Sequence, residues 1–147
     1  MVADENMSIT LAEAKKIIEA ARKRAEEMNA KMSFAVVDSS GHLVLVERMD
    51  GSAWITVDIA IAKAYTAVAF RLIGERFTDT GQIGAYFADT PSFLIALSIS
   101  SHGKIIGRGG GVPIVKDGKI IGGLGISGGT SQQDHECCLA GLASLQL

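Results

Sequence analysis

Three stretches of the chain have the patterns of helices, and in the first two of them apolar side chains recur every three or four residues, which is the spacing of one face of an α-helix. These stretches cover residues 9–29, 53–73 and 130–145, and each is predicted to be a helix. The middle stretch is rich in alanine, so we expect another element to pack very close to it. The first and last stretches begin with the pattern of a capping box, Thr10 with Glu13 and Thr130 with Gln133.

Shorter runs rich in Val, Ile, Leu and Phe predict β-strands between these helices. Ser39-Ser40-Gly41 separates the first two runs and Asp117-Gly118 separates the last two, and both sequences are typical of hairpin turns. The strands on either side of each turn are therefore expected to be antiparallel neighbours. The segment 79–90 has the composition of a short helical or irregular stretch that ends at Pro91. The five predicted strands are residues 32–38, 43–47, 93–99, 112–115 and 120–127.

The predicted order of elements is a helix, a hairpin, a helix, three strands and a final helix. This order is that of an α+β domain with a central antiparallel sheet flanked by helices. A chain of 147 residues can bury one continuous core but is too short for two domains. We therefore predict a flexible N-terminus at residues 1–7 and a single domain at residues 8–147.

Composition excludes some classes of function and favours self-association. Hydrophobic residues make up 48% of the chain, and the mean hydropathy is +0.28. A domain this small leaves much of its area exposed, so we expect apolar surface to be buried between the subunits of a homo-oligomer. The net charge of −2 provides no basic stripe for nucleic acid. No apolar stretch approaches the roughly 20 residues of a membrane span.

A cytoplasmic location is the expectation from the N-terminus and the cysteines. The first seven residues include Asp4 and Glu5 and have no apolar core, so they do not resemble a signal peptide. The two cysteines, Cys137 and Cys138, are adjacent, and a disulfide between neighbours is strained. A reducing compartment fits this pattern, with both cysteines acting as small buried hydrophobic residues.

Three glycines, Gly123, Gly125 and Gly128, spell G-x-G-x-x-G between a predicted strand and a predicted helix, which is the context of a dinucleotide fingerprint. However, a Rossmann unit needs a second parallel strand with an acidic residue about 20 residues further on, and here the preceding strand belongs to a hairpin. We interpret the motif as part of a strand in which glycines, having no side chain, allow another element to pack closely. The Gly128-Gly129 turn that follows exposes a helix N-terminus, which can bind an anion.

A second glycine cluster, at positions 107 and 109–111, precedes the predicted strand 112–115. It is not a phosphate-binding loop, because no helix and no Gly-Lys-Ser/Thr sequence follows it. It is either a structural bulge or a backbone lip over a flat ligand, since glycine lets the main chain lie against a ring.

Of the three histidines, two lie at positions where a ligand could reach the ring. His42 follows a hairpin turn and His102 lies in a predicted loop, so each is either an ordinary surface residue or a residue that a ligand can reach. His135 belongs to the run Asp134-His135-Glu136-Cys137, whose side chains point in directions 100° apart on a helix. They cannot converge on one ion, so a structural zinc site is not predicted and any metal ligand is left unknown.

Two basic residues stand out by their position. Lys63 lies inside an apolar stretch, so its ammonium either extends outward to water or faces a pocket as an anchor for an anion. Arg48 directly follows the second strand and could bind a carboxylate.

Several of these segments together resemble the GlcG/HbpS-like haem-binding family, to which the C-terminal domain of PduO-type cobalamin adenosyltransferases is related. The resemblance implies a profilin-like α/β/α fold and homo-oligomers, with octamers among known members. It also implies binding or degradation of haem, and sometimes of corrinoids, in redox sensing or uptake. The matching segments are 36–44, 47–51, 60–66, 110–114, 117–118, 125–129 and 133–134, in family order over about residues 8–145.

The leading hypothesis is therefore a homo-oligomer that binds haem or a related tetrapyrrole, with cobalamin as a second ligand, in haem handling or redox sensing. The alternative is an accessory protein or enzyme that acts on a small carboxylate metabolite, with Arg48 as the clamp. A third hypothesis is a purely structural assembly partner. The residues expected to contact the ligand are His42, Arg48, Lys63, Gly109, Gly110, Gly111, Pro113, Ser127, Gly128 and Gly129.

Overall fold

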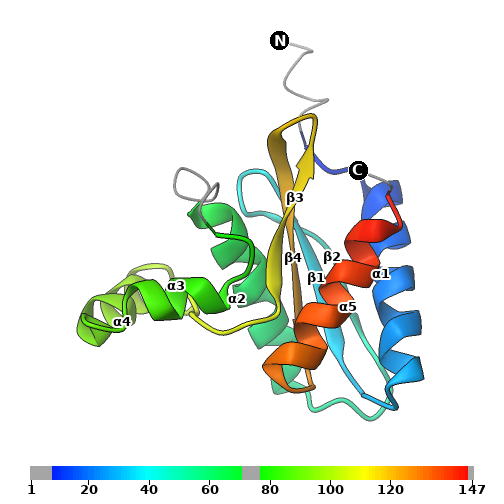
Figure 1. Cartoon of the computed structure of the whole chain (residues 1–147), viewed down its shortest axis with the longest axis horizontal. Helices are drawn as coiled ribbons and strands as arrows, with labels where there is room; N and C mark the ends of the chain where they lie inside the picture. Colours follow the sequence, from blue (N-terminus) through cyan, green and yellow to red (C-terminus); the bar gives the residue numbers. More distant parts are fainter. Residues whose placement is uncertain (1–7, 71–76, 146–147) are drawn as a thin grey trace.

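The computed structural model describes residues 8–70 and 77–145, which form one antiparallel sheet with helices on both faces (Figure 1). The strands lie in the order β2-β1-β4-β3. Helices α1 and α5 cover one face and α2 covers the other, so the predicted α+β fold with its α/β/α layers is confirmed. The elements are α1 (Leu11–Glu27), β1 (Ser33–Asp38), β2 (Leu43–Arg48), α2 (Ile55–Ala69), α3 (Gly81–Tyr86), α4 (Pro91–Ser100), β3 (Gly111–Lys116), β4 (Lys119–Ser127) and α5 (Ser131–Ala143).

The predicted capping boxes begin α1 and α5. The hydroxyl of Thr10 accepts a hydrogen bond from the backbone N–H of Glu13 at 3.1 Å, and the carboxylate of Glu13 accepts one from the backbone N–H of Thr10 at 2.9 Å. Thr130 and Gln133 make the same pair of bonds at 3.1 and 3.0 Å. These bonds pair backbone N–H groups that the start of a helix leaves without partners.

The Asp117-Gly118 turn between β3 and β4 is also confirmed. Both residues have positive φ angles, 52° at Asp117 and 75° at Gly118, which is the backbone conformation of a two-residue type I′ hairpin.

Central strand β1 separates two hydrophobic cores. Phe34 and Val36 pack in the cluster that contains α1 and α5, whereas Ala35 and Val37 pack in the cluster of α2. All four side chains are fully buried. A strand that is covered on both faces has a continuous run of apolar residues in its sequence, because neither face alternates with polar residues.

Helix α2 lies directly on the backbone of β4. A Cβ atom on Gly125 would collide with the backbone of Ala60 and Ala64, and one on Gly123 would collide with the carbonyl oxygen of Ala64. The alanines of α2 and the glycines of β4 therefore serve close packing, as the sequence indicated. Because β4 is the second strand of a hairpin, the G-x-G-x-x-G motif is not a dinucleotide site.

The predicted strand at residues 93–99 is wrong, because this segment is the helix α4. Pro91 occupies the first helical turn, where its missing N–H costs no hydrogen bond. In a short apolar run, periodicity does not distinguish a buried strand from a helix. The flanking residues, here Pro91, are needed to decide between the two. The segment 79–90 contains the short helix α3.

The ends of the predicted elements differ slightly from those observed. The second helix was expected to reach residue 73, but α2 ends at Ala69 and residues 71–73 lie outside the described part of the chain. The N-terminal segment 1–7, predicted to be flexible, also lies outside it. Among the described helices, none combines the length and apolar character needed to cross a membrane.

Candidate functional site

Asp79 lies just before α3, and its carboxylate joins three parts of the fold. Oδ1 accepts a hydrogen bond from the backbone N–H of Gly81 at 2.7 Å, and Oδ2 accepts one from Gly110 at 3.1 Å. Oδ2 also lies 2.7 Å from Nδ1 of His135 on α5. The Asp79 side chain is only 14% exposed. One carboxylate thus fixes α3, the glycine loop before β3 and a histidine of α5 relative to one another.

His135 has one ring nitrogen held by protein and the other open. A carboxylate that already receives backbone N–H groups acts as an acceptor, so Nδ1 of His135 is the donor in this pair. Within residues 8–70 and 77–145, Nε2 has no hydrogen-bond partner. The imidazole side chain is 35% exposed and is therefore accessible from outside.

The glycine loop 109–111 is a structural junction. Gly110 has a φ of 107°, and a Cβ atom there would lie 2.6 Å from Cβ of Asp134. Its N–H donates to Asp79, while its carbonyl accepts from the N–H of Ile126 at 2.8 Å and from Sγ of Cys138 at 3.3 Å. Gly110 and Gly111 are buried, so the loop packs inside the protein, which agrees with the structural reading of this cluster.

Lys63 forms a buried ion pair with Asp134. Its Nζ donates to Oδ2 of Asp134 at 3.0 Å and to the carbonyl of Ile126 at 2.7 Å. The side chains of Lys63 and Asp134 are 1% and 3% exposed. The alternative in which Lys63 extends to water is wrong, because the carboxylate from α5 compensates the buried charge. The pair links α2 and α5, which lie on opposite faces of the sheet.

The turn between β4 and α5 belongs to the same cluster. Ser127 is buried, Gly128 has a φ of 137°, and the N–H of Gly129 donates to Oδ1 of Asp134 at 2.9 Å. Of the expected site residues, the structure therefore brings together Lys63, the glycine loop and this turn.

His42 and Arg48 lie away from this cluster and from each other. His42 is on the β1–β2 turn with a side chain that is 79% exposed, 3.5 Å from the carboxylate of Asp38. Arg48 is at the other end of β2, which places it roughly 20 Å from His42 at the usual rise of a strand. It borders an open surface depression together with Arg22 and Lys31.

A backbone lip at the glycine loop would need space for a flat ligand beside it, but the cavity between α2, α3 and Gly111 is nearly filled. Its walls include Thr66 and Phe70 from the α2 side, Thr80 and Ile83 from the α3 side, and Gly111. The free volume is about 10 Å³, which is close to the space of a single water molecule. A flat macrocycle does not fit in this cavity.

An open apolar groove of about 360 Å³ runs instead along the outer edge of the sheet, between β3 and α5. Val115 and Leu139, on its two sides, are 41% and 51% exposed. His135 precedes Leu139 by four residues, so both lie on the same face of α5. The groove is lined by Pro113, Val115, Leu139, Leu142 and Ala143.

Two lysines flank Asp117 and Gly118 in the β3–β4 turn, beyond the residues that line this groove. Lys116 and Lys119 are directly opposite each other in the register of the two strands. Within the described residues, the ion-pair partner of Lys116 is Glu13, at 3.7 Å.

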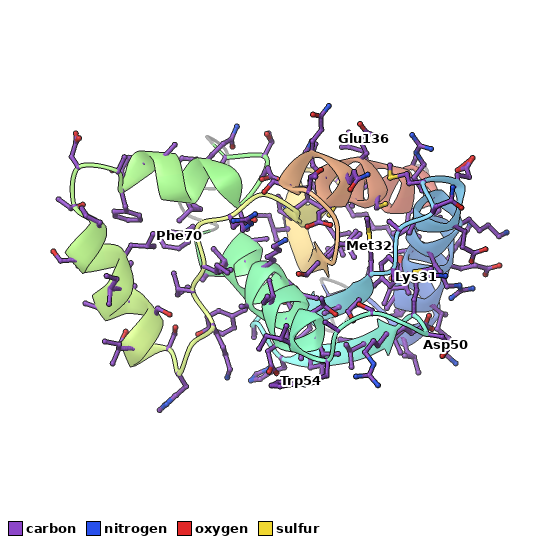
Figure 2. All side chains as sticks on the ribbon, turned by 90° about the horizontal axis from the view of Figure 1, so that it is seen from below. Lys31, Met32, Asp50, Trp54, Phe70 and Glu136 are labelled. Atoms are coloured by element: carbon purple, nitrogen blue, oxygen red, sulfur yellow. The ribbon has the colours of Figure 1, made fainter. Side chains whose placement is uncertain are left out.

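Helices α3 and α4 form an apolar arm beside the sheet (Figure 2). The ring of Phe87 packs against Phe70 and Phe93 in this arm, with ring centroids 6.0 and 5.5 Å apart. Helix α4 has no charged residue and no buried residue. Ile95 and Ile99 are 60% and 73% exposed.

The cysteines are packed in the protein interior, as predicted. Both are free and buried, and burial raises the pKa of Cys137 to about 11 and that of Cys138 well above its ordinary value. A thiol with such a pKa is a poor nucleophile at neutral pH. In the described part of the chain, no three His, Cys, Asp or Glu side chains gather to hold a metal ion.

Asp79 and Asp134 organise this part of the fold through partners that are distant in the sequence. Asp79 lies 56 residues before His135, and Lys63 lies 71 residues before Asp134. The capping box at Thr130 located the helix that carries His135 and Asp134, but no pattern in the sequence identified their partners.

Comparison with known proteins agrees with this fold and extends it. The model of the family described as "Haem degrading protein HbpS-like" matches residues 9–143, so the chain belongs to the HbpS-like family and the predicted resemblance is confirmed. A 15.0 kDa protein from the dhaT-dhaS intergenic region of Citrobacter freundii is 40% identical over 128 residues, which cover 87% of this chain and 85% of that protein.

Two solved structures are similar over almost the whole chain. Klebsiella pneumoniae ORFY superposes with a TM-score of 0.83 and 33% identity, covering 94% of this chain and 90% of that one. A complex of PduOC with haem superposes with a TM-score of 0.80 and 29% identity, covering 93% and 94%.

Proposed function

We propose that this protein binds haem in the groove between α5 and β3. The observation that carries the proposal is an open apolar groove beside β3, with Lys116 and Lys119 in the adjoining β3–β4 turn. Haem is a flat apolar ring with two carboxylates, and a site for it needs apolar walls together with cations on one side. Pro113 and Leu139 contribute to the walls, and Lys116 and Lys119 supply the cations.

The lysine pair is itself an argument for a negatively charged ligand. Like charges directly opposite each other on neighbouring strands destabilise a sheet. The Lys116 side chain is 47% exposed, and its contact with Glu13 is a long one at 3.7 Å. Carboxylates bound between Lys116 and Lys119 would relieve this repulsion.

The relatives support haem as the ligand. The matching family is described as haem degrading, and a structure with the same fold is a complex with haem. Cobalamin is the second candidate, because part of a corrinoid adenosyltransferase from Citrobacter freundii is 31% identical to this chain, which spans 40% of that enzyme.

The arm formed by α3 and α4 supports assembly with further copies of the same chain. A helix that is apolar on all sides is normally buried, yet Ile95 and Ile99 of α4 are largely exposed in the single chain. Two copies can cover these side chains by packing the same patch against itself, which is the geometry of a symmetric dimer contact. We therefore include homo-oligomerisation in the proposal.

The haem proposal is tested by titrating the purified protein with hemin and, separately, with cobalamin, and recording absorption spectra. Saturable binding at micromolar hemin with a shifted Soret band is expected. Replacing both Lys116 and Lys119 with alanine should weaken binding about tenfold and reduce its salt dependence, since the lost contacts are charged. The matched control replaces Lys15 and Lys16 on α1, which should leave affinity unchanged.

Two results would contradict the proposed site. Hemin that shows no saturable binding removes haem as the ligand, and saturation by cobalamin alone would assign the groove to a corrinoid. Equal hemin affinity in a Leu139→Asp variant and in the matched surface control Leu11→Asp would show that the groove is not the site.

Assembly is tested by light scattering coupled to size-exclusion chromatography. Ile99→Lys should elute as a smaller species than the unmodified protein, because a charge in the arm cannot be buried without a partner. Leu11→Lys, at another exposed apolar position on α1, should leave the mass unchanged. An unmodified protein with the mass of one chain would refute this part of the proposal.

A further inference from the structure

One histidine in this chain is held in a fixed orientation by a carboxylate. His42 is largely exposed on a turn, and His102 is exposed in a loop with a φ of 59°. Within residues 8–70 and 77–145, the ring of His135 makes a hydrogen bond of 2.7 Å to Asp79, whereas Nδ1 of His42 lies 3.5 Å from the carboxylate of Asp38. The structure therefore distinguishes His135 from the other histidines, which the sequence did not.

The contacts of Asp79 determine which nitrogen of His135 is available. Asp79 receives N–H groups from Gly81 and Gly110, which fixes both of its oxygens as acceptors. Nδ1 of His135 therefore carries the proton in the neutral ring, and the lone pair is on Nε2. Metal-binding histidines characteristically have such a carboxylate on the other ring nitrogen, because it orients the ring and makes the free nitrogen more basic.

The position of His135 relates it to the groove proposed for haem. It lies one helical turn before Leu139 on the same face of α5, and Leu142 follows on that face about 10 Å along the helix axis from His135. The lysine pair lies beyond the other end of the groove. The ring of His135 and the lysine pair therefore lie toward opposite ends of the apolar groove between β3 and α5.

The surroundings of His135 suit an ion that is already held by a macrocycle. The described residues contain no cluster of three metal-ligating side chains, so a bare ion would have too few protein ligands here. Haem iron has four nitrogen ligands from its own ring and takes one or two more from the protein, most often an imidazole.

We propose that Nε2 of His135 is an axial ligand of haem iron and that Asp79 is the positioning residue that fixes the ring and its tautomer. This inference rests on the proposed function, because it identifies the iron ligand of that site. It assigns a role to a histidine and an aspartate that lie outside the residues expected from the sequence.

The test is a hemin titration of the full chain with absorption and electron paramagnetic resonance spectra of the ferric complex. The unmodified protein should show the spectrum of histidine-ligated haem. His135→Ala should lose this spectrum, and imidazole added at millimolar concentration should restore it. Asp79→Asn, which keeps the shape of the side chain, should weaken hemin binding by about 10-fold to 100-fold. His42→Ala and His102→Ala are the matched controls and should behave like the unmodified protein.

The outcomes separate this inference from the proposed function. If the unmodified protein does not bind hemin, the proposed function itself is wrong. If it binds hemin and His135→Ala keeps the same spectrum and affinity, the groove remains a haem site but His135 is not the ligand. Loss of the spectrum in His42→Ala or His102→Ala would also overturn the assignment. Alanine is favourable within a helix, and far-ultraviolet circular dichroism verifies that each variant is folded.

Discussion

Replacing Lys63 with methionine should lower the free energy of unfolding by about 3–5 kcal/mol, the usual effect of removing one partner from a buried ion pair. The Asp134 carboxylate is 3% exposed and would lose the ammonium that lies 3.0 Å away. It would keep one hydrogen bond, from the N–H of Gly129 at 2.9 Å. The carbonyl of Ile126 would lose its donor from Lys63 as well, at a further cost of about 1 kcal/mol.

A second variant separates the cost of the lone charge from the loss of packing. Combining Lys63→Met with Asp134→Asn removes both charges, while the amide oxygen can still accept the N–H of Gly129. The double variant should therefore recover at least about 2 kcal/mol relative to the single one, because no uncompensated charge stays buried. The matched surface control is Lys23→Met, which breaks a pair with Glu19 that is largely exposed, and it should cost less than about 0.5 kcal/mol.

The assay is equilibrium urea unfolding at one fixed protein concentration, followed by far-ultraviolet circular dichroism. Circular dichroism is preferred because Trp54, the chain's one tryptophan, is already 70% exposed in the folded protein and its fluorescence would report unfolding weakly. The reasoning would be refuted if Lys63→Met cost less than about 1 kcal/mol. It would also be refuted if the double variant were no more stable than the single one.

Three further predictions test the packing, the capping box and the buried thiols. Gly125→Ala should cost about 3 kcal/mol or more in urea unfolding, since the added Cβ meets the backbone of Ala60. The hydrogen bond from the backbone of Thr10 is the chief cause that lowers the pKa of Glu13. The ionised carboxylate therefore stabilises the fold at pH values above 4.5, the ordinary pKa of a glutamate. This stabilisation is lost as the pH falls through the lowered pKa. Glu13→Gln should therefore lose less stability than the unmodified protein between pH 6 and pH 3 in urea unfolding. Cys137, with a pKa of about 11, should not react with a disulfide reagent at pH 8 until urea unfolds the chain.

Each of these has a control or a result that would contradict it. Gly118→Asn adds a side chain in open space at a φ that asparagine tolerates, so it should be far milder than Gly125→Ala, and equal costs would argue against the packing explanation. An unchanged pH dependence in Glu13→Gln would argue against the capping-box explanation. Rapid reaction of both thiols in the folded protein would show that the interior around Cys137 and Cys138 opens readily.

The glycine loop shows how far the sequence could predict the site. The cluster at positions 107 and 109–111 was conspicuous, but its two readings, a bulge and a backbone lip, were equally compatible with glycine. In the structure the backbone of Gly110 is bonded to two distant residues, Asp79 and Cys138, which no local pattern indicates. The outward orientation of Lys63 is wrong for a similar reason, because the carboxylate that meets its ammonium belongs to Asp134, 71 residues further along the chain.

The segment 91–100 shows where local patterns fail. Its residues are almost all apolar or small, so neither the period of a helix nor that of a strand is visible. In the fold, this segment leaves the sheet and lies in the arm with α3, where it is helical (Figure 1).

The sequence by itself determined the features that are made by residues close together in the chain. The capping boxes of Thr10 and Thr130 and the Asp117-Gly118 turn depend on hydrogen bonds and φ angles within two to four residues, so they are encoded locally. The tertiary structure alone decided the two polar pairs, Asp79 with His135 and Lys63 with Asp134. Their partners are separated by 56 and 71 residues, and only the folded backbone brings such residues within hydrogen-bond distance.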